Sequence, residues 1–319
     1  MDLPLPCPLQ AGWELIRTIS LPRKAADGRS LGGFSAASYQ TKEDKLWLLS
    51  DSSRGHLVPW GGLAKLIAGT SNKLTPGPRR QLRDPAGHEL PKGFDGEGLV
   101  VEGGHAWIAS EGSRRPKRAA RLIRIDVQTG RIQKLIPLPK SWIAQPGQGL
   151  ASNKGPESLT LLNSSELLIA AERPLLQSNN PTAIPIARVT TTGTLISESE
   201  LELGFSGSQD GLTDLLALPR RNRLLALVRG FDAPFTWRAR LVLYSLPKAT
   251  AAPPLQPLIG WNLLETGLPA DNWEALTVGP RLADGRTTLV LASDDNYSPF
   301  QENWLAVMAP RRTSSCRNE

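Results

Sequence analysis

The chain has 319 residues, of which 40% are hydrophobic and 21% charged, a composition typical of a globular protein rather than a disordered one. The formal net charge is +7, but the basic residues are scattered over many loops without a recognition helix or an RNA-binding aromatic motif, so we expect no nucleic-acid partner. The two cysteines exclude a disulfide-dense scaffold and a cysteine-based zinc site, and no run approaches the roughly 18 apolar residues of a membrane span.

The N-terminal segment lacks a basic stretch followed by an apolar one, so no signal peptide is visible and the sequence by itself indicates a cytoplasmic protein. Residues 13–21 then form an isolated strand with no partner nearby in the sequence. We expect a single domain over residues 1–319, with loose tails at 1–11 and 311–319.

From residue 35 onward, one pattern occurs five times. Each copy has a polar residue in a turn, an apolar strand, a second turn and a second apolar strand. The five polar residues are Ser35, Glu97, Glu157, Thr213 and Glu274, so the steps between copies are 62, 60, 56 and 61 residues. The residues that follow the second strands are Asp51, Glu111, Glu172, Arg229 and Asp294.

The unit that begins at Glu97 shows its internal organisation most clearly. Strands are expected at 98–101, 106–110, 121–126 and 131–137, and Gly130 allows the tight turn before the last of them. A repeat of this length with room for four strands is typical of a β-propeller. The sequence therefore predicts an all-β propeller with four-stranded blades.

The last copy supplies only three strands, at 275–278, 288–292 and 304–308. If residues 13–21 provide its fourth strand, the ring closes without an open edge, which predicts five blades. Residues 55–93, rich in Gly, Pro and Arg, leave open a sixth blade or one long insertion.

The same closure brings the two cysteines to one edge of the last blade. Cys7 precedes the first strand and Cys316 follows the last one. The sequence does not show that they approach within the roughly 7 Å that a disulfide requires.

Acidic residues gather at one end of the predicted propeller. The start of each innermost strand and the end of the second strand lie together there, because the two strands are antiparallel. Eight carboxylates converge at this end, namely Asp51, Glu97, Glu111, Glu157, Glu172, Glu274, Asp294 and Asp295. Like charges in close proximity resist joint ionisation, so the cluster favours a bound cation.

An all-oxygen ligand set suits calcium, or magnesium if waters complete the shell. The alternative is that these acids only cap backbone N–H groups in the turns. The use of Glu in three copies favours the functional interpretation, since capping ordinarily uses Ser, Thr, Asp or Asn. The three histidines, at 56, 88 and 105, share no metal-ligand spacing and are expected to be solvated loop residues.

The loops that open from the same end are basic, and an anionic substrate is expected there. The residues that we expect to bind it are Arg54, Arg114, Arg173 and Arg229. A phosphate ester fits a ring of cations around a metal best. No Gly-x-Ser-x-Gly elbow, phosphate-binding loop or dinucleotide fingerprint occurs, so metal-activated water with a carboxylate base is the expected mechanism. Glu97, Glu157 and Glu274 are the candidate catalytic carboxylates.

The chain resembles the "esterase-like activity of phytase" (phytase-like) family of largely bacterial proteins. The resemblance extends over about residues 30–310. Its most specific part is Asn272-Trp273-Glu274-Ala275-Leu276 with Ser293-Asp294-Asp295-Asn296-Tyr297. It also includes Asp95-Gly96-Glu97-Gly98-Leu99 and Pro156-Glu157-Ser158-Leu159.

This resemblance implies a monomeric propeller phosphoesterase that acts through bound calcium on a small anionic substrate. Two alternatives stay open: a non-catalytic propeller that binds a ligand or a protein partner, and a calcium-dependent lactonase-like esterase. Members of the family are often exported, which contrasts with the lack of a visible signal peptide.

Overall fold

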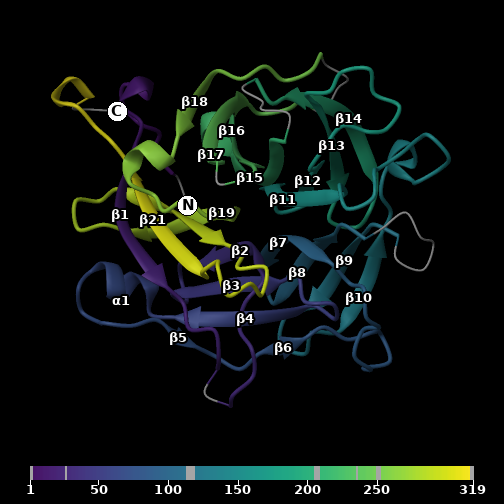
Figure 1. Ribbon diagram of the computed structural model, residues 1–319, viewed down its shortest axis with the longest axis horizontal. Coiled ribbons are helices and arrows are strands. Elements are labelled where there is room, and N and C mark those ends of the chain that lie inside the picture. The colour runs from purple at the N-terminus through teal and green to yellow at the C-terminus, as the bar shows by residue number, and fades with distance from the viewer. Residues whose placement is uncertain are drawn as a thin grey trace.

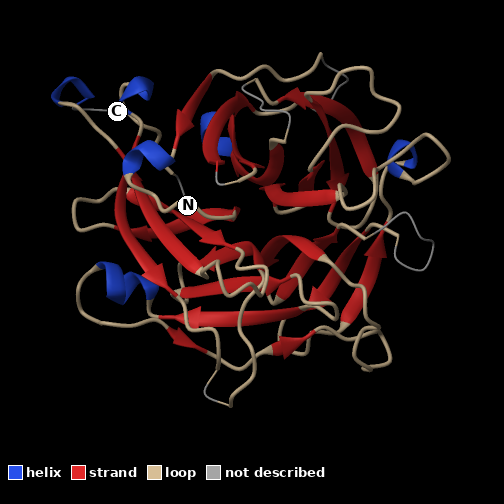
Figure 2. Cartoon of the chain, in the orientation of Figure 1, coloured by secondary structure: helices blue, strands red, loops and turns tan. Residues whose placement is uncertain are grey.

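The computed structural model describes residues 3–25, 27–112, 119–204, 209–234, 236–248 and 253–316. Within these ranges the regular secondary structure is mostly β-strand, as Figure 2 shows, and the one α-helix is α1 (Leu63–Ile67). None of the described helices is long and apolar enough to cross a membrane.

Five antiparallel sheets surround a common axis as the blades of a propeller (Figure 1). Blade 1 contains β2 (Phe34–Gln40), β3 (Lys45–Ser50), β4 (His56–Gly61) and the short β5 (Thr75–Pro76) and β6 (Arg80–Gln81). Blade 2 contains β7 (Gly96–Glu102), β8 (His105–Ser110), β9 (Arg121–Asp126) and β10 (Ile132–Ile136). Blade 3 contains β11 (Pro156–Asn163), β12 (Glu166–Ala171), β13 (Ala183–Thr190) and β14 (Leu195–Glu202).

Blade 4 contains β15 (Gly211–Leu218), β16 (Arg223–Asp232), β17 (Thr236–Ser245) and β18 (Ile259–Asn262). Blade 5 contains β19 (Trp273–Arg281), β20 (Thr287–Ser293), β21 (Trp304–Pro310) and, as its outer strand, β1 (Trp13–Ser20). The antiparallel pairing of β1 with β21 runs from Trp13 opposite Pro310 to Ser20 opposite Trp304. The prediction of five blades closed by the N-terminal strand is therefore confirmed.

The alternative of a sixth blade within residues 55–93 is wrong. After β4, this segment forms α1 and the two-residue strands β5 and β6, both of which pair with β4. The segment therefore completes blade 1 instead of building a new sheet.

The histidine prediction holds for only part of the set. His88 is an exposed loop residue, and His105 lies half-buried in β8. The prediction is wrong for His56, which is 1% exposed within β4 and shares a 2.8 Å hydrogen bond between Nδ1 and Ser52 Oγ. Burial, together with Arg79, lowers the pKa of His56 to about 3, so this side chain is neutral in the folded protein.

The hydrophobic core is divided among the five junctions between neighbouring blades. Five clusters of buried residues occur, and each combines side chains from two adjacent blades. The second strands are buried on both faces because every blade packs between two others, as the fully buried β20 illustrates. This explains why the second strands are nearly continuous apolar runs in the sequence.

Side-chain oxygens join the innermost strands across the blade junctions. Three of these oxygens come from the hydroxyl residue three positions after the polar residue that begins each repeat. Ser38 Oγ accepts the Val101 N–H (3.1 Å), Thr160 Oγ1 the Ala217 N–H (3.0 Å) and Thr277 Oγ1 the Tyr39 N–H (3.2 Å). Between blades 4 and 5, Asp214 Oδ2 accepts the Leu276 N–H at 2.7 Å instead. These bonds satisfy backbone donors that would otherwise be buried without a partner.

A disulfide joins the two ends of the chain beside blade 5. Cys7 and Cys316 are bonded with a Cα–Cα distance of 5.9 Å. The Cys7 N–H also donates to the Arg311 carbonyl, and the Thr313 N–H donates to the Cys7 carbonyl, both at 3.0 Å. The expectation of loose tails is thus corrected for the described parts of both tails, because the disulfide, these two hydrogen bonds and a parallel bridge between Cys7 and Arg312 hold them together.

Loss of the Thr160 hydroxyl should destabilise the junction between blades 3 and 4. We expect Thr160→Val, which keeps the shape but removes the acceptor of the Ala217 N–H, to lower the free energy of unfolding by about 1–3 kcal/mol. Urea unfolding measures this change. Thr160→Ser, which retains the hydroxyl, is the matched control and should be much closer to the wild type; equal losses in both variants would assign the effect to packing.

Removal of the disulfide should weaken the closure of the ring. We expect Cys316→Ser to lower the free energy of unfolding by about 2–4 kcal/mol, because the cross-link restricts the unfolded chain. Thermal unfolding with and without a reducing agent measures this effect. The reductant should lower the melting temperature of the wild type and leave that of the variant unchanged, and a wild type that is insensitive to reduction would contradict the expectation.

Candidate functional site

A β-bulge occurs at the same place in all five innermost strands. The pairing of the first two strands of each blade slips by one residue near the start of the innermost strand. The residues skipped by the ladder are Ser35, Glu97, Glu157, Thr213 and Glu274. These are the polar residues that begin the five sequence repeats. A bulge turns the extra residue away from the regular alternation of a strand, so it can direct a side chain out of the sheet.

A second set of residues follows the ends of the second strands. The Asp51 N–H donates to the Gly33 carbonyl at 2.8 Å, and the N–H groups of Glu111, Glu172 and Asp294 make the equivalent bonds to residues 95, 155 and 272. In blade 4, Arg229 occupies this place and pairs with Gly211. The backbone therefore places four acids and one arginine beside the five bulges.

We call these two sets together the acidic ring. It comprises Ser35, Glu97, Glu157, Thr213 and Glu274 at the bulges, and Asp51, Glu111, Glu172, Arg229 and Asp294 at the strand ends. The electrostatic interactions of Glu97 reach Glu157, Glu274 and Glu111, so the members face one another across blade boundaries. Seven carboxyl groups and one guanidinium group thus share one end of the propeller.

The tightest part of the acidic ring lies between blades 2 and 3. Glu111, Glu157 and Glu172 are all buried, and each offers a carboxylate oxygen within 4.8 Å of the others. Glu111 and Glu157 are in hydrogen-bonding contact, which requires a shared proton when no cation lies between them. Lys154 Nζ donates to Glu172 Oε2 at 2.6 Å and offsets part of the negative charge.

The pKa values of most carboxyl groups in the acidic ring are raised. Burial, followed by the charges of neighbouring acids, raises the pKa of Asp51 and that of Glu111 to about 7. The same causes raise the pKa values of Glu97, Glu157 and Asp294 well above their ordinary range. Carboxyl groups that lie this close in a desolvated site bind either protons or a cation.

Arg229 and Glu274 form the ion pair of the acidic ring. Arg229 Nη2 donates to Glu274 Oε1 at 2.7 Å, and Asn272 Nδ2 donates to the same oxygen at 2.8 Å. Burial raises the pKa of Glu274, while Arg229 acts in the opposite direction. The negative charges of Glu274, Glu172 and Glu157 in turn raise the pKa of Arg229 against the effect of its burial.

Other residues predicted from the sequence lie beside the acidic ring rather than in it. Arg54 donates to the Leu90 carbonyl at 3.0 Å and lies 3.7 Å from Glu89, so it is directed toward a neighbouring loop. Arg173 Nε lies 3.7 Å from Glu172 Oε1, at the edge of the ring. Arg114 lies outside the described residues.

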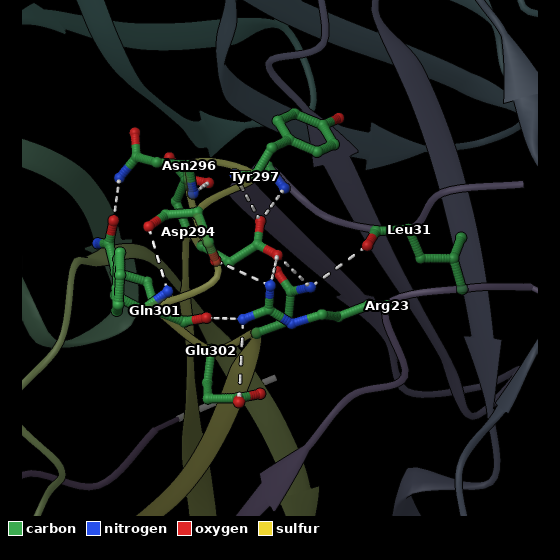
Figure 3. Close-up of polar contacts among 12 residues, drawn as sticks. Arg23, Leu31, Asp294, Asn296, Tyr297, Gln301 and Glu302 are labelled. Atoms are coloured by element: carbon green, nitrogen blue, oxygen red, sulfur yellow. Dashed lines mark hydrogen bonds and ion pairs between the residues drawn. The ribbon is translucent and has the colours of Figure 1, made fainter.

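Asp295 holds the loop that follows β20. Its Oδ1 accepts the N–H groups of Gly33 (2.9 Å) and Tyr297 (3.1 Å), and its Oδ2 accepts from Asn303 Nδ2 at 3.1 Å. Figure 3 shows Arg23 between this loop and Glu302, with Leu31 close by. Arg23 also donates to the carbonyls of residues 298 and 301, so the loop is fixed from several sides.

The sequence analysis missed Asp95, which precedes the bulge of β7 by two positions. Its side chain is in hydrogen-bonding contact with Glu97 and with Glu111, and burial raises its pKa. Asp95 and Asp51 also line a pocket of about 230 Å³ at the edge of the acidic ring. Its position next to a predicted site residue in an acidic turn was a signal that could have identified it.

The donor set of the acidic ring fits a hard divalent cation, because the groups that it offers are carboxylate oxygens. One of them, Asp51 Oδ1, is buried without a hydrogen-bond partner in the described part of the chain. Calcium takes six to eight such oxygens, and magnesium takes fewer with retained waters. The geometry therefore can hold a cation close to groups able to accept a proton.

Comparison with solved structures identifies propellers of several activities. The Bacteroides ovatus xyloglucan PUL protein GH43B matches with a TM-score of 0.51 and 12% identity, over 91% of this chain and 54% of that one. The chain thus spans about half the length of that relative. An endo-arabinase from Bacteroides thetaiotaomicron matches with a TM-score of 0.51 and 11% identity, over 88% of this chain and 94% of that one.

A glucose dehydrogenase matches with a TM-score of 0.50 and 10% identity, over 93% of this chain and all of that one (100%). At these identities the similarity shows the propeller fold alone. No curated protein matches the sequence. Residues 29–297 match the family described as "Esterase-like activity of phytase", and this range includes every member of the acidic ring. The chain therefore belongs to the phytase-like family.

Proposed function

We propose that the protein is a calcium-dependent phosphoesterase that acts at the acidic ring on a small anionic phosphate ester. The observation that carries this proposal is the buried group of Glu111, Glu157 and Glu172, whose carboxylate oxygens lie within 4.8 Å of one another. A site that only capped backbone turns would not bring three carboxyl groups from two blades into such proximity.

The raised pKa values support a cation as the natural partner of this cluster. At neutral pH the group must otherwise retain protons that isolated carboxyl groups would have lost. A divalent ion would replace those protons and stabilise the ionised forms. Calcium bound there would lower the pKa of a water molecule and polarise the ester.

Different parts of the chain would have different tasks in this proposal. Glu111, Glu157 and Glu172 would hold the ion, with magnesium as the alternative metal. Glu97, at the bulge of the neighbouring β7, interacts electrostatically with Glu157 and Glu111 and, once ionised, would accept a proton from the attacking water. Arg229 and Arg173 are suited to bind the anion, and Glu274 would position Arg229 through their 2.7 Å hydrogen bond.

Calcium should bind to and stabilise the chelator-treated protein. We expect millimolar calcium to raise the melting temperature, since a ligand present at 100 times its dissociation constant stabilises the folded state by about 2.7 kcal/mol. Glu157→Gln should abolish most of this rise in melting temperature. Glu102→Gln should retain it, because Glu102 is an exposed residue at the end of β7 that lies away from the acidic ring. An unchanged melting temperature of the wild type would refute the metal site.

Activity assays separate the proposed reaction from the alternatives. We expect hydrolysis of p-nitrophenyl phosphate or of bis-p-nitrophenyl phosphate with calcium, and loss of this activity in Glu97→Gln while the protein stays folded. Calcium-dependent hydrolysis of a carboxylic ester alone would favour the lactonase-like alternative. Calcium binding without turnover of any of the three substrates would favour a non-catalytic binding protein.

The charge of Glu111 should make stability depend on pH in the presence of a chelator. Because its pKa is raised to about 7, the folded state binds the proton more tightly than the unfolded state. This contribution to stability is present below the unfolded pKa of about 4.5 and is lost as the pH rises to about 7. Glu111→Gln should therefore gain about 1–3 kcal/mol relative to the wild type over that interval.

Urea unfolding at several pH values tests this expectation. His56, with its lowered pKa, has the opposite pH dependence, but it is present in both proteins and cancels in the difference. Glu102→Gln should show no such trend. A stability difference between Glu111→Gln and the wild type that is constant from pH 4.5 to pH 7 would contradict the assigned burial of this carboxyl group.

A further inference from the structure

A pocket of about 500 Å³ adjoins the acidic ring between blades 4 and 5. Its inner wall contains Arg229 and Asn272, the two residues that donate to Glu274. Its other lining residues are Phe231, Pro234, Trp237, Asn296, Ser298, Phe300 and Gln301. The pocket is therefore continuous with the proposed reaction site.

One wall of the pocket is the end of an extended hairpin. β16 and β17 have ten residues each, whereas the corresponding β8 and β9 have six. The extension ends in Phe231 and Trp237, whose ring centroids lie 4.5 Å apart at an interplanar angle of 45°. It is anchored by Arg238, which donates to Asp210 and to Asp232 at 2.6 Å each.

The opposite wall is the loop between β20 and β21. Asp295 and Arg23 fix this loop, as Figure 3 shows for Asn296, Tyr297 and Gln301. The loop presents Phe300 with 94% of its surface exposed. Together with the half-buried Phe231 and Trp237, it forms an exposed aromatic patch at the pocket, and such patches mark binding surfaces.

The polar side chains of the pocket already make hydrogen bonds within the protein. Asn272 donates to Glu274, and Asn296 Nδ2 donates to Gln301 Oε1 at 3.3 Å. Ser298 Oγ accepts the Phe300 N–H at 3.3 Å. The surface that is left for a ligand consists mainly of aromatic faces and Pro234, which favours a planar apolar ring over a polyhydroxylated one.

We propose that this pocket binds the apolar ring of an aryl-type substrate and holds the anionic group of that substrate beside Arg229. The inference rests on the proposed function only for the identity of the reacting phosphate group. The preference for a ligand with an aromatic ring concerns binding alone. Both walls are anchored by ion pairs before a ligand arrives, so the pocket needs little rearrangement to bind. The residues that determine the preference are Phe231, Trp237 and Phe300.

Calorimetric titration with two non-hydrolysable anions tests the inference. Phenylphosphonate and methylphosphonate have the same charged group and differ in the ring. We expect calcium-loaded wild-type protein to bind phenylphosphonate about tenfold more tightly, and Phe300→Ala to reduce this preference about fivefold. Phe231→Ala should reduce it as well, and the melting temperature of each variant monitors folding.

Leu135→Ala is the control, because Leu135 is an exposed apolar residue (62%) on β10, distant from the pocket in sequence and blade. It should leave both affinities unchanged. Three results would each overturn the inference. They are equal affinities of the wild type for the two phosphonates, no detectable binding of phenylphosphonate at millimolar concentration, and an undiminished preference of Phe300→Ala for phenylphosphonate. A retained phenyl preference in a protein that hydrolyses no ester would support the pocket while refuting the proposed reaction.

Discussion

The functional end of this propeller depends on one backbone irregularity, the β-bulge that begins each innermost strand. In a regular ladder the bulged residue would face a neighbouring blade, where a glutamate would be buried without compensation. The extra residue in the bulge breaks the alternation at that point and lets the strand resume it immediately afterwards. Leu99, Leu159 and Leu276 can therefore pack in the blade junctions, while Glu97, Glu157 and Glu274 meet near the axis. Because the bulge is repeated, one local device produces a ring of carboxyl groups.

That ring makes the site costly for the protein without a bound cation. Burial and mutual repulsion raise the pKa values of most of its acids. Among the residues described above, Arg229, Lys154 and Arg173 provide ion pairs to members of the ring. A fold selected for stability alone would favour smaller polar residues, as Ser35 and Thr213 illustrate in two of the five copies. Retention of charge at the other positions is consistent with the trade-off between stability and activity found at functional sites.

The sequence predicted those features that follow from repetition. Steps of about 60 residues fixed the number of blades, and the missing fourth strand of the last repeat identified residues 13–21 as its partner. What it could not predict depends on contacts between segments with no repeat. The burial of His56 follows from the way residues 55–93 fold back onto blade 1. The approach of Cys7 to Cys316 depends on the paths of two tails that meet through a separate parallel bridge at Arg312. The anchoring role of Asp295 depends on Gly33 and Asn303.

The positions where the repeats differ have their own physical meaning. Blade 4 replaces both acids of the pattern, with Thr213 at the bulge and Arg229 at the strand end, so the negative ring has one positive sector. The same blade has the extended β16–β17 hairpin, and the adjoining blade 5 has the anchored loop with Phe300. The negative charge that could attract a metal thus comes from the pattern that the repeats share, whereas the cationic and aromatic surfaces come from the positions where blades 4 and 5 differ from that pattern. A closed ring of five equal blades would have no preferred side from which a substrate could approach, and these departures provide one.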